Sequence, residues 1–392
     1  MTKLNNIIFI FFITFSILNL YSHDLIQSIG KYGKTIIIPF IIYYFFYNIY
    51  NYKIIIKFNN IIYILFLFFI IGSINYIFYN NDYDGLIYVL IFISYIIYFY
   101  FFIYQLKISY PDNYFDILFN ILKKTYIANF LFGFLFGFLT DISFWVVNKD
   151  TLAFGGFLGT SLLFGWLSLS FYFSVFFSKN KNTIDYLLLI ISIIFVYISA
   201  ARGAELTLLL FILFTIYLKL TFYYFNQYFT IVLKVMIIFV FTIIIYYLFY
   251  QISSYELNKL LTGRLFIWNI TINNIFYNDI IYFGYGLNGY QEYLLDKYIN
   301  TVYYFQDLKQ SNGNLSLHSS YLTILTTGGL LSLITFFYII YKVLYNTKDY
   351  LIIALLLSIL IGGIIEQFIM SPNIPISILF WIIIIIKLER EH

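Results

Sequence analysis

Residues 184–201 read IDYLLLIISIIFVYISAA and are followed at once by Arg202. This stretch carries a single charged residue, Asp185. A helix rises about 1.5 Å per residue, so a stretch of this length reaches roughly 27 Å, close to the ~30 Å thickness of the hydrocarbon core of a bilayer. The stretch therefore predicts a membrane-spanning helix that ends in a short polar turn.

The composition of the whole chain indicates the same fold class. Hydrophobic residues make up 62 % of the 392 residues and charged residues 10 %, with a mean hydropathy of +0.88. Charged residues make up roughly 25 % of an ordinary soluble domain. Inside lipid, helices satisfy all their own backbone polar groups. The sequence thus predicts one all-α polytopic membrane domain over residues 1–392. Because the chain has no cysteine, disulfides and a thiol nucleophile are excluded.

Apolar stretches similar to residues 184–201 recur along the chain between short clusters of polar residues. We expect each of them to be one transmembrane helix, which gives about twelve spans. Their expected positions are Leu4–Tyr21, Thr35–Tyr50, Ile61–Tyr79, Gly85–Gln105, Thr125–Thr140, Leu152–Phe177, Ile184–Ala201, Leu206–Leu220, Ile231–Tyr250, Ser319–Tyr341, Tyr350–Met370 and Ile374–Ile386.

The lysines and arginines predict the orientation of these spans. With the N-terminus in the cytoplasm, fourteen of the 22 basic residues fall on the inner side and eight on the outer side. Four of the outer eight lie in residues 251–317, a long polar segment in which the positive-inside bias counts for less. Both termini are therefore expected in the cytoplasm. Residues 251–317 are expected to form a folded outer loop, since they contain Trp268 and several glycines and tyrosines.

Arginine is rare in this chain, which has 19 lysines and only three arginines. Arg390 lies in the C-terminal tail, whereas Arg202 follows the seventh expected span and Arg264 lies early in the long outer segment. A planar guanidinium binds phosphate or carboxylate in a bidentate manner better than an ammonium does. We expect Arg202 and Arg264 to bind an anionic group; the alternative is that both anchor helix ends at the membrane surface.

His318 opens the tenth expected span and is the best placed of the three histidines. An imidazole titrates near neutrality and can accept a proton from a hydroxyl group, although a histidine at a helix start can also have no such task. Arg202 follows seven crossings, and Arg264 and His318 both follow nine, so the three face the same aqueous side. Together they predict a site for a pyrophosphate-linked substrate and a hydroxyl acceptor.

Four acidic residues are weaker candidates. Glu366 lies in an apolar run, where an ionisable group is costly and often functional, and Glu205 could pair with a neighbouring basic group. Asp82 and Asp84 have the Asp-x-Asp spacing of some metal-dependent glycosyltransferases, but a solvated turn is the favoured interpretation. No metal ligands and no cofactor are therefore expected. The glycines at 133, 137, 155 and 156 are expected to allow close packing rather than to bind phosphate.

Three blocks in residues 199–330 resemble the bacterial O-antigen polymerase and O-antigen ligase family. They are Ser199–Glu205, then Gly263-Arg264 with Trp268 and Gly284-Tyr285-Gly286, and finally His318 with Tyr321-Leu322 and Gly328-Gly329-Leu330. The usual His-Asn pair of the family reads His318-Ser319 in this chain.

This resemblance implies an integral-membrane glycosyltransferase of the GT-C type in the bacterial inner membrane, with its active face in the periplasm. The donor would be a glycan on undecaprenyl pyrophosphate, Arg202 and Arg264 would hold the pyrophosphate, and His318 would act as base or position the acceptor. The bilayer would be a partner, as would a chain-length regulator and a flippase of the same pathway, and nucleic acid would not.

Three functions fit the resemblance and the residues to different degrees. A polymerase that joins lipid-linked repeat units is favoured, and a ligase that transfers the glycan to lipid A–core is the alternative. A transporter or flippase is less favoured, because it predicts internal symmetry and charges through the middle of several spans, where this chain offers mainly Glu366.

Overall fold

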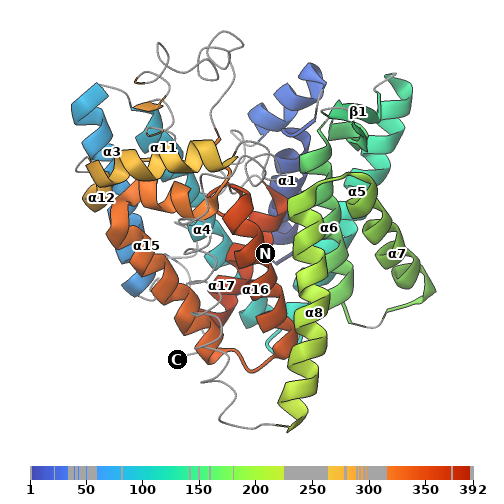
Figure 1. Cartoon of the computed structure of the whole chain (residues 1–392). Helices are drawn as coiled ribbons and strands as arrows, with labels where there is room; N and C mark the ends of the chain where they lie inside the picture. The colour runs from blue at the N-terminus through green and yellow to red at the C-terminus, as the bar shows by residue number, and fades with distance from the viewer. Residues whose placement is uncertain are drawn as a thin grey trace. The chain divides into compact units, whose positions relative to one another are not determined.

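The computed structural model describes residues 2–21, 23–33, 60–80, 83–140, 143–148, 151–158, 160–179, 181–224, 264–277, 280–287, 316–371 and 374–388, together with a few single residues elsewhere. These parts are predominantly α-helical (Figure 1). The helices are α1 (Thr2–Leu18), α3 (Asn60–Asn80), α4 (Asp84–Ser109), α5 (Tyr114–Leu139), α6 (Ser161–Phe177), α7 (Thr183–Ile198), α8 (Arg202–Tyr224), α11 (Arg264–Tyr277), α12 (Ile280–Phe283), α15 (Ser320–Asn346), α16 (Tyr350–Ile365) and α17 (Pro375–Leu388).

Most of the predicted spans that fall within the described residues are helices with nearly the expected ends. α5 is the clearest difference, because it begins at Tyr114 rather than at Thr125 and carries Lys123 and Lys124 inside the helix. The predicted spans Thr35–Tyr50 and Ile231–Tyr250 lie almost entirely outside the described residues, as does most of segment 251–317 apart from α11 and α12.

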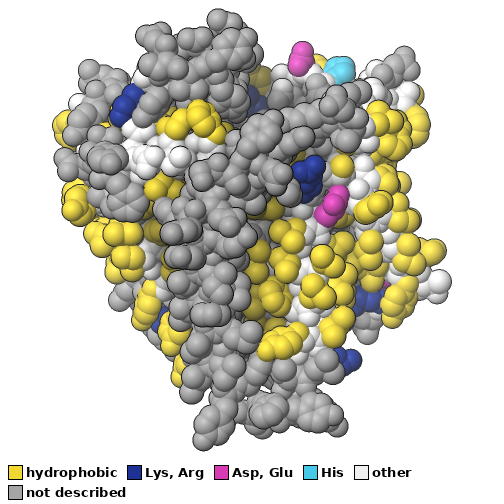
Figure 2. Space-filling view, viewed as in Figure 1, with side chains coloured by type: hydrophobic (Ala, Val, Ile, Leu, Met, Phe, Trp, Pro, Cys, Tyr) yellow, Lys and Arg dark blue, Asp and Glu magenta, His cyan; other side chains and the backbone are white. Residues whose placement is uncertain are grey.

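Three of the described helices, α4, α5 and α15, are long and apolar enough to cross a membrane. Six others, namely α1, α3, α6, α7, α16 and α17, contain apolar stretches of 14 to 17 residues. Several helices also expose large apolar side chains, and apolar side chains (yellow) make up most of the coloured surface in Figure 2. On α7 they include Ile184, Leu187, Ile190, Ile194 and Tyr197. Such a surface is unfavourable in water and suits contact with lipid tails, so the chain is a helical membrane protein.

A β-hairpin occupies the start of the predicted span Leu152–Phe177, so this span is α-helical only from Ser161. Strand β1 (Trp145–Asn148) pairs antiparallel with β2 (Thr151–Phe154), with Trp145 opposite Phe154. The hairpin ends where Gly155 N and Gly156 N both donate to Phe144 O, and Gly156 has a φ of +52° that favours glycine. A short 3₁₀ helix, η1 (Gly156–Leu158), follows, so α6 begins only at Ser161.

The glycines of α5 pack against the aromatic rings of this region. A Cβ added at Gly133 would meet the ring of Phe157, and one added at Gly137 would meet the ring of Phe144. The glycines were expected to let another helix pack closely; instead, Gly133 and Gly137 make room for rings from the hairpin region.

The chain divides into two compact units, and two of the four divisions fall inside α4 and α8. The first unit comprises residues 1–58, 92–209 and 371–392. Within it, α6 packs against α5, α7 and α17, and α1 packs against α5 and α17 (Figure 1). Aromatic rings fill much of this unit; for example, Phe9 of α1 stacks on Phe102 of α4 with ring centroids 3.9 Å apart.

The second unit comprises residues 59–91 and 210–370, and α15 is at its centre. α15 packs against α3, α12 and α16, and it is kinked at Gly328-Gly329. At the kink, Tyr285 N donates to Thr326 O (2.7 Å) and Gly286 N donates to Thr327 O (2.9 Å). A Cβ at Gly72 of α3 would collide with Thr327 O, so the backbones meet here without a side chain between them.

Candidate functional site

Arg264 is the first residue of α11, and its mostly buried guanidinium is held by two groups at the end of α16. Its Nη2 donates to Glu366 Oε1 at 2.8 Å, and its Nη1 donates to the carbonyl oxygen of Ile365. The Glu366 carboxylate is almost completely buried, with a side-chain exposure of 5 %. A buried carboxylate needs a partner of opposite charge, and Arg264 supplies it.

One donor of Arg264 is not used by this arrangement. The Nε atom is buried and has no hydrogen-bond partner among the described residues. Buried donors are nearly always hydrogen-bonded in folded proteins, so an unused one is an unusual feature. An anionic oxygen brought to this edge of the guanidinium would satisfy it.

His318 lies just before α15 in an unusual backbone conformation. Its φ is +49°, in the left-handed region that few non-glycine residues adopt. Its backbone N donates to Ser316 Oγ at 3.2 Å, and Ser319 caps α15 by accepting from Leu322 N. Ser319, which stands where the family usually has asparagine, is therefore the N-cap of α15.

The surroundings of His318 keep its imidazole neutral. Burial, and secondarily the positive charge of Arg264, lower the pKa of His318 from its usual 6.5 to about 4. Desolvation and a neighbouring cation both disfavour the protonated form. At neutral pH the ring is therefore a free base that lies near a guanidinium.

Trp268 fixes α11 to the His318 turn. It lies one helical turn after Arg264, on the same face of α11, and its Nε1 donates to the carbonyl oxygen of Leu317 at 2.8 Å. The side chain is buried. The start of α11 is thus tied to both the end of α16 and the residue before His318.

Two polar residues that the sequence analysis did not single out also connect the end of α16 to the residues at the start of α15. Ser320 Oγ donates to Glu366 O at 2.7 Å, and Gln367 Oε1 accepts from Leu317 N at 3.2 Å. A signal for Gln367 was present in the sequence, since it is a second polar residue beside Glu366 in an otherwise apolar run.

Arg202 and Glu205 belong to the first compact unit, whereas Arg264, His318 and Glu366 belong to the second. Arg202 is the first residue of α8 and is exposed; Glu205, in the same helical turn, is half-buried. The preceding turn is tight, because Ala200 has a φ of +50° and a Cβ at Gly165 of α6 would collide with Ala201. Small residues thus allow α6 to pack directly under the turn that presents Arg202.

Asp84 begins α4, and Asp82 lies outside the described residues. In the described part of the chain, no three histidine, aspartate or glutamate side chains gather in a way that would hold a metal ion.

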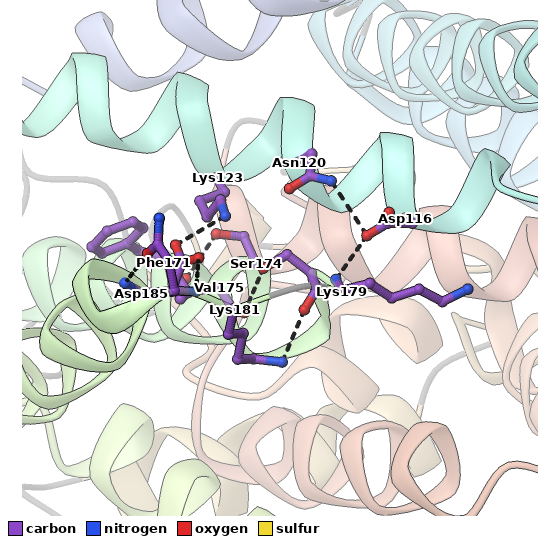
Figure 3. A network of polar contacts seen from close by, with 11 residues as sticks. Asp116, Asn120, Lys123, Phe171, Ser174, Val175, Lys179, Lys181 and Asp185 are labelled. Carbon is purple, nitrogen blue, oxygen red and sulfur yellow. Dashed lines mark hydrogen bonds and ion pairs between the residues drawn. The ribbon is translucent and has the colours of Figure 1, made fainter.

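A second polar cluster lies between α5 and the α6–α7 connection, in the first unit (Figure 3). Lys123 Nζ donates to Asp185 Oδ1 at 2.9 Å, and Asp116 Oδ1 accepts from the backbone N of Lys179 at 2.7 Å. Asp185 also forms a reciprocal capping box with Asn182 at the start of α7. These contacts join α5 to the α6–α7 connection and to the start of α7, so the cluster stabilises the packing of these helices.

Residues 187–337 match a protein-family model described as O-antigen ligase. The matched segment contains Arg202, Glu205, Arg264 and His318 and ends before Glu366. A comparison with curated proteins gives no match. The family match confirms the resemblance to the O-antigen polymerase and ligase family and covers all three blocks that carry it.

Proposed function

From this match of residues 187–337 to the O-antigen ligase family, we propose that the protein is a glycosyltransferase that polymerises oligosaccharide repeat units carried on undecaprenyl pyrophosphate. It would build O-antigen or another surface polysaccharide at the periplasmic face of the bacterial inner membrane. The observation that carries the proposal is the pairing of Arg264, held by Glu366 with its Nε unused, with a neutral His318.

The proposed reaction is an inverting displacement at the anomeric carbon of the donor sugar. A hydroxyl group of the acceptor attacks this carbon while its bond to the pyrophosphate oxygen breaks. The neutral imidazole of His318 accepts the hydroxyl proton, a role for which a base must lie within hydrogen-bond reach of the acceptor. Undecaprenyl pyrophosphate leaves with the electron pair of the broken bond, and no cofactor or metal ion is assigned a role.

Arg202 and Arg264 would stabilise the charge that develops on the leaving pyrophosphate. Preorganised donors of this kind are each worth roughly 3–4 kcal/mol of transition-state stabilisation. Glu366 would orient the guanidinium of Arg264, because it accepts from Nη2 while Ile365 O accepts from Nη1. Glu205 would orient Arg202 in a similar way from the same turn of α8.

The description of the matching family favours a second candidate, an O-antigen ligase. The ligase would use the same donor and leaving group but lipid A–core as the acceptor. The two functions therefore share the chemistry at Arg264 and His318 and differ in the acceptor hydroxyl.

Deletion of the gene, followed by gel analysis of the surface glycan, tests both candidates. A polymerase deletion leaves a single repeat unit on core, whereas a ligase deletion leaves bare core and long glycan on the undecaprenyl carrier. Complementation with His318→Ala or Arg264→Ala should reproduce the deletion pattern, while the wild-type gene restores the full glycan. Normal glycan in the deletion strain would contradict both functions.

A further inference from the structure

The last residue of α16 and the four residues that follow it contact Arg264, the His318 turn and the start of α15. Ile365 and Glu366 bind Arg264, as described above. The carbonyl oxygen of Glu366 also accepts from Ser320 N (3.2 Å) and from Ser320 Oγ (2.7 Å). In return, Ser320 Oγ accepts from the backbone N atoms of Phe368 (3.1 Å) and Ile369 (3.2 Å). The start of α15 is therefore bonded to this segment on both sides of Gln367.

Gln367 supplies the side chain that reaches the residues before His318. Its Oε1 accepts from Leu317 N at 3.2 Å and from Ser316 Oγ at 3.3 Å. Ser316 Oγ in turn accepts from His318 N at 3.2 Å. One amide oxygen thus fixes, directly or through one hydroxyl, three consecutive residues of the turn.

The backbone of His318 needs such support. A left-handed φ at a non-glycine residue costs free energy and persists only where neighbouring groups hold it. Relaxation of this residue would rotate the imidazole away from its half-buried position beside Arg264. Among the described residues, the other bonds at the turn lie at Ser320 and at Trp268, which contacts the Leu317 carbonyl, so Gln367 holds the N–H side of the turn together with Ser316.

We propose that Gln367 is a positioning residue for His318: its amide oxygen holds the Ser316–His318 turn so that the imidazole faces the acceptor hydroxyl. The role of His318 itself rests on the proposed function. Because Arg264 is held by the neighbouring Ile365 and Glu366, loss of the Gln367 bonds should impair proton transfer without weakening the hold on the pyrophosphate.

Two substitutions separate hydrogen bonding from size. Gln367→Met keeps the length of the side chain but removes the acceptor oxygen, whereas Gln367→Glu keeps an oxygen that can accept from Leu317 N and Ser316 Oγ. Gln27→Met is the matched control, since Gln27 is an exposed glutamine in the first unit. The activity probe is the undecaprenyl-pyrophosphate-linked repeat unit extracted from a deletion strain, given to the full-length protein in proteoliposomes.

We expect Gln367→Met to lower kcat about tenfold to a hundredfold, a part of the 10²–10⁴-fold effect of a general base, with KM for the lipid-linked donor changed less than about twofold. Gln367→Glu should restore most of kcat, and Gln27→Met should match wild type. In protein labelled at its three histidines, NMR titration should show the pKa of His318 rising toward 6.5 in Gln367→Met, because the ring becomes more exposed.

The outcomes distinguish the two proposals. Wild-type kcat and an unchanged His318 titration in Gln367→Met, with His318→Ala inactive, overturn the positioning role and leave the proposed function intact. Equal loss in the methionine and glutamate variants with an unchanged titration also overturns it, because the effect is then merely structural. Wild-type activity of His318→Ala overturns the proposed function itself, whereas the NMR result for Gln367→Met still tests whether this side chain holds the turn.

Discussion

The guanidinium of Arg264 and the carboxylate of Glu366 lie 2.8 Å apart although 102 residues separate them in the chain. This ion pair joins the first turn of α11, within the long segment 251–317, to the end of α16. It thereby places a cation beside His318, and the two residues form the centre of the proposed site.

Arg264→Lys should lose most of the transferase activity, by about a hundredfold or more, because removal of one preorganised donor costs 10²–10³ in kcat. A single ammonium cannot hold Ile365 O and Glu366 Oε1 in the same fork and still present a further donor edge. The measurement is the rate of polymer formation in proteoliposomes, with Lys124→Arg, at an exposed lysine of the first unit, as the control. Near-wild-type turnover of Arg264→Lys would contradict a bidentate role.

Glu366→Leu should destabilise the protein by about 3–5 kcal/mol, since it leaves the mostly buried guanidinium of Arg264 without its counter-charge. Glu366→Gln should cost less stability, because its amide oxygen still accepts from Nη2. Thermal unfolding of the purified protein in detergent measures both effects. If the leucine variant unfolds at the wild-type temperature, the ion pair between Arg264 and Glu366 does not stabilise the protein.

His318 should make the protein less stable as the pH falls from about 6.5 to about 4. The unfolded chain takes up a proton on this imidazole near pH 6.5, whereas the folded chain does so only near pH 4, so protonation favours unfolding in this window. Comparison of unfolding between pH 7 and pH 4 for wild type and His318→Gln isolates this contribution. The variant should show a smaller decrease in stability, and an identical pH dependence of the two proteins would disprove the low pKa.

Arg264→Gln should raise the pKa of His318, because it removes the neighbouring positive charge and leaves burial as the main cause of the shift. Histidine NMR titration of the variant measures this rise, and His318→Gln identifies the resonance. An unchanged midpoint would mean that the two side chains do not interact electrostatically.

Gly329→Ala should destabilise the second unit by about 1–3 kcal/mol. Gly329 has φ +75° and ψ −175°, a conformation nearly restricted to glycine, and a Cβ there would collide with the backbone of Tyr282. Gly363→Ala, inside α16, is the control, since its added methyl meets mainly the mobile end of the Ile369 side chain. Thermal unfolding compares the two variants, and equal stability would show that the kink at Gly328-Gly329 tolerates side chains.

Transferase activity should be unchanged in EDTA, because the proposed charge stabilisation comes from guanidinium groups. Loss of turnover on chelation, with recovery on addition of Mg²⁺ or Mn²⁺, would return Asp82 and Asp84 to consideration as metal ligands. The assay is the same polymer-forming reaction in proteoliposomes.

Local signals in the sequence predicted most of the described helices. Helix α7 begins and ends close to the expected positions. An apolar run covers residues 184–201, and Asn182 and Asp185 form a capping box at the start of the helix. The hairpin was missed because Leu152, Ala153 and Phe154 continue an apolar run into α6, so composition alone does not separate a strand from a helix there. The β-branched residues of Trp145–Asn148 and the glycines after Phe154 were the signal for it.

The site was predictable only in part. The scarcity of arginine drew attention to Arg264, and the position of His318 before an apolar span drew attention to the imidazole. Their link to Glu366 and Gln367 depends on α15 and α16 packing antiparallel at one end, which no local periodicity encodes. The left-handed backbone of His318 likewise follows from its tertiary hydrogen bonds and not from its neighbours in the sequence.

The close contact between Gly72 and Thr327 has a consequence for biosynthesis. About 250 residues separate these two positions, so at roughly 5–20 residues per second the ribosome needs on the order of 13 to 50 s to deliver α15 after α3 has emerged. During that interval Gly72 of α3 lacks its contact with the backbone of Thr327. Premature termination before residue 320 would leave it in that unassembled state, as a substrate for membrane quality-control proteases.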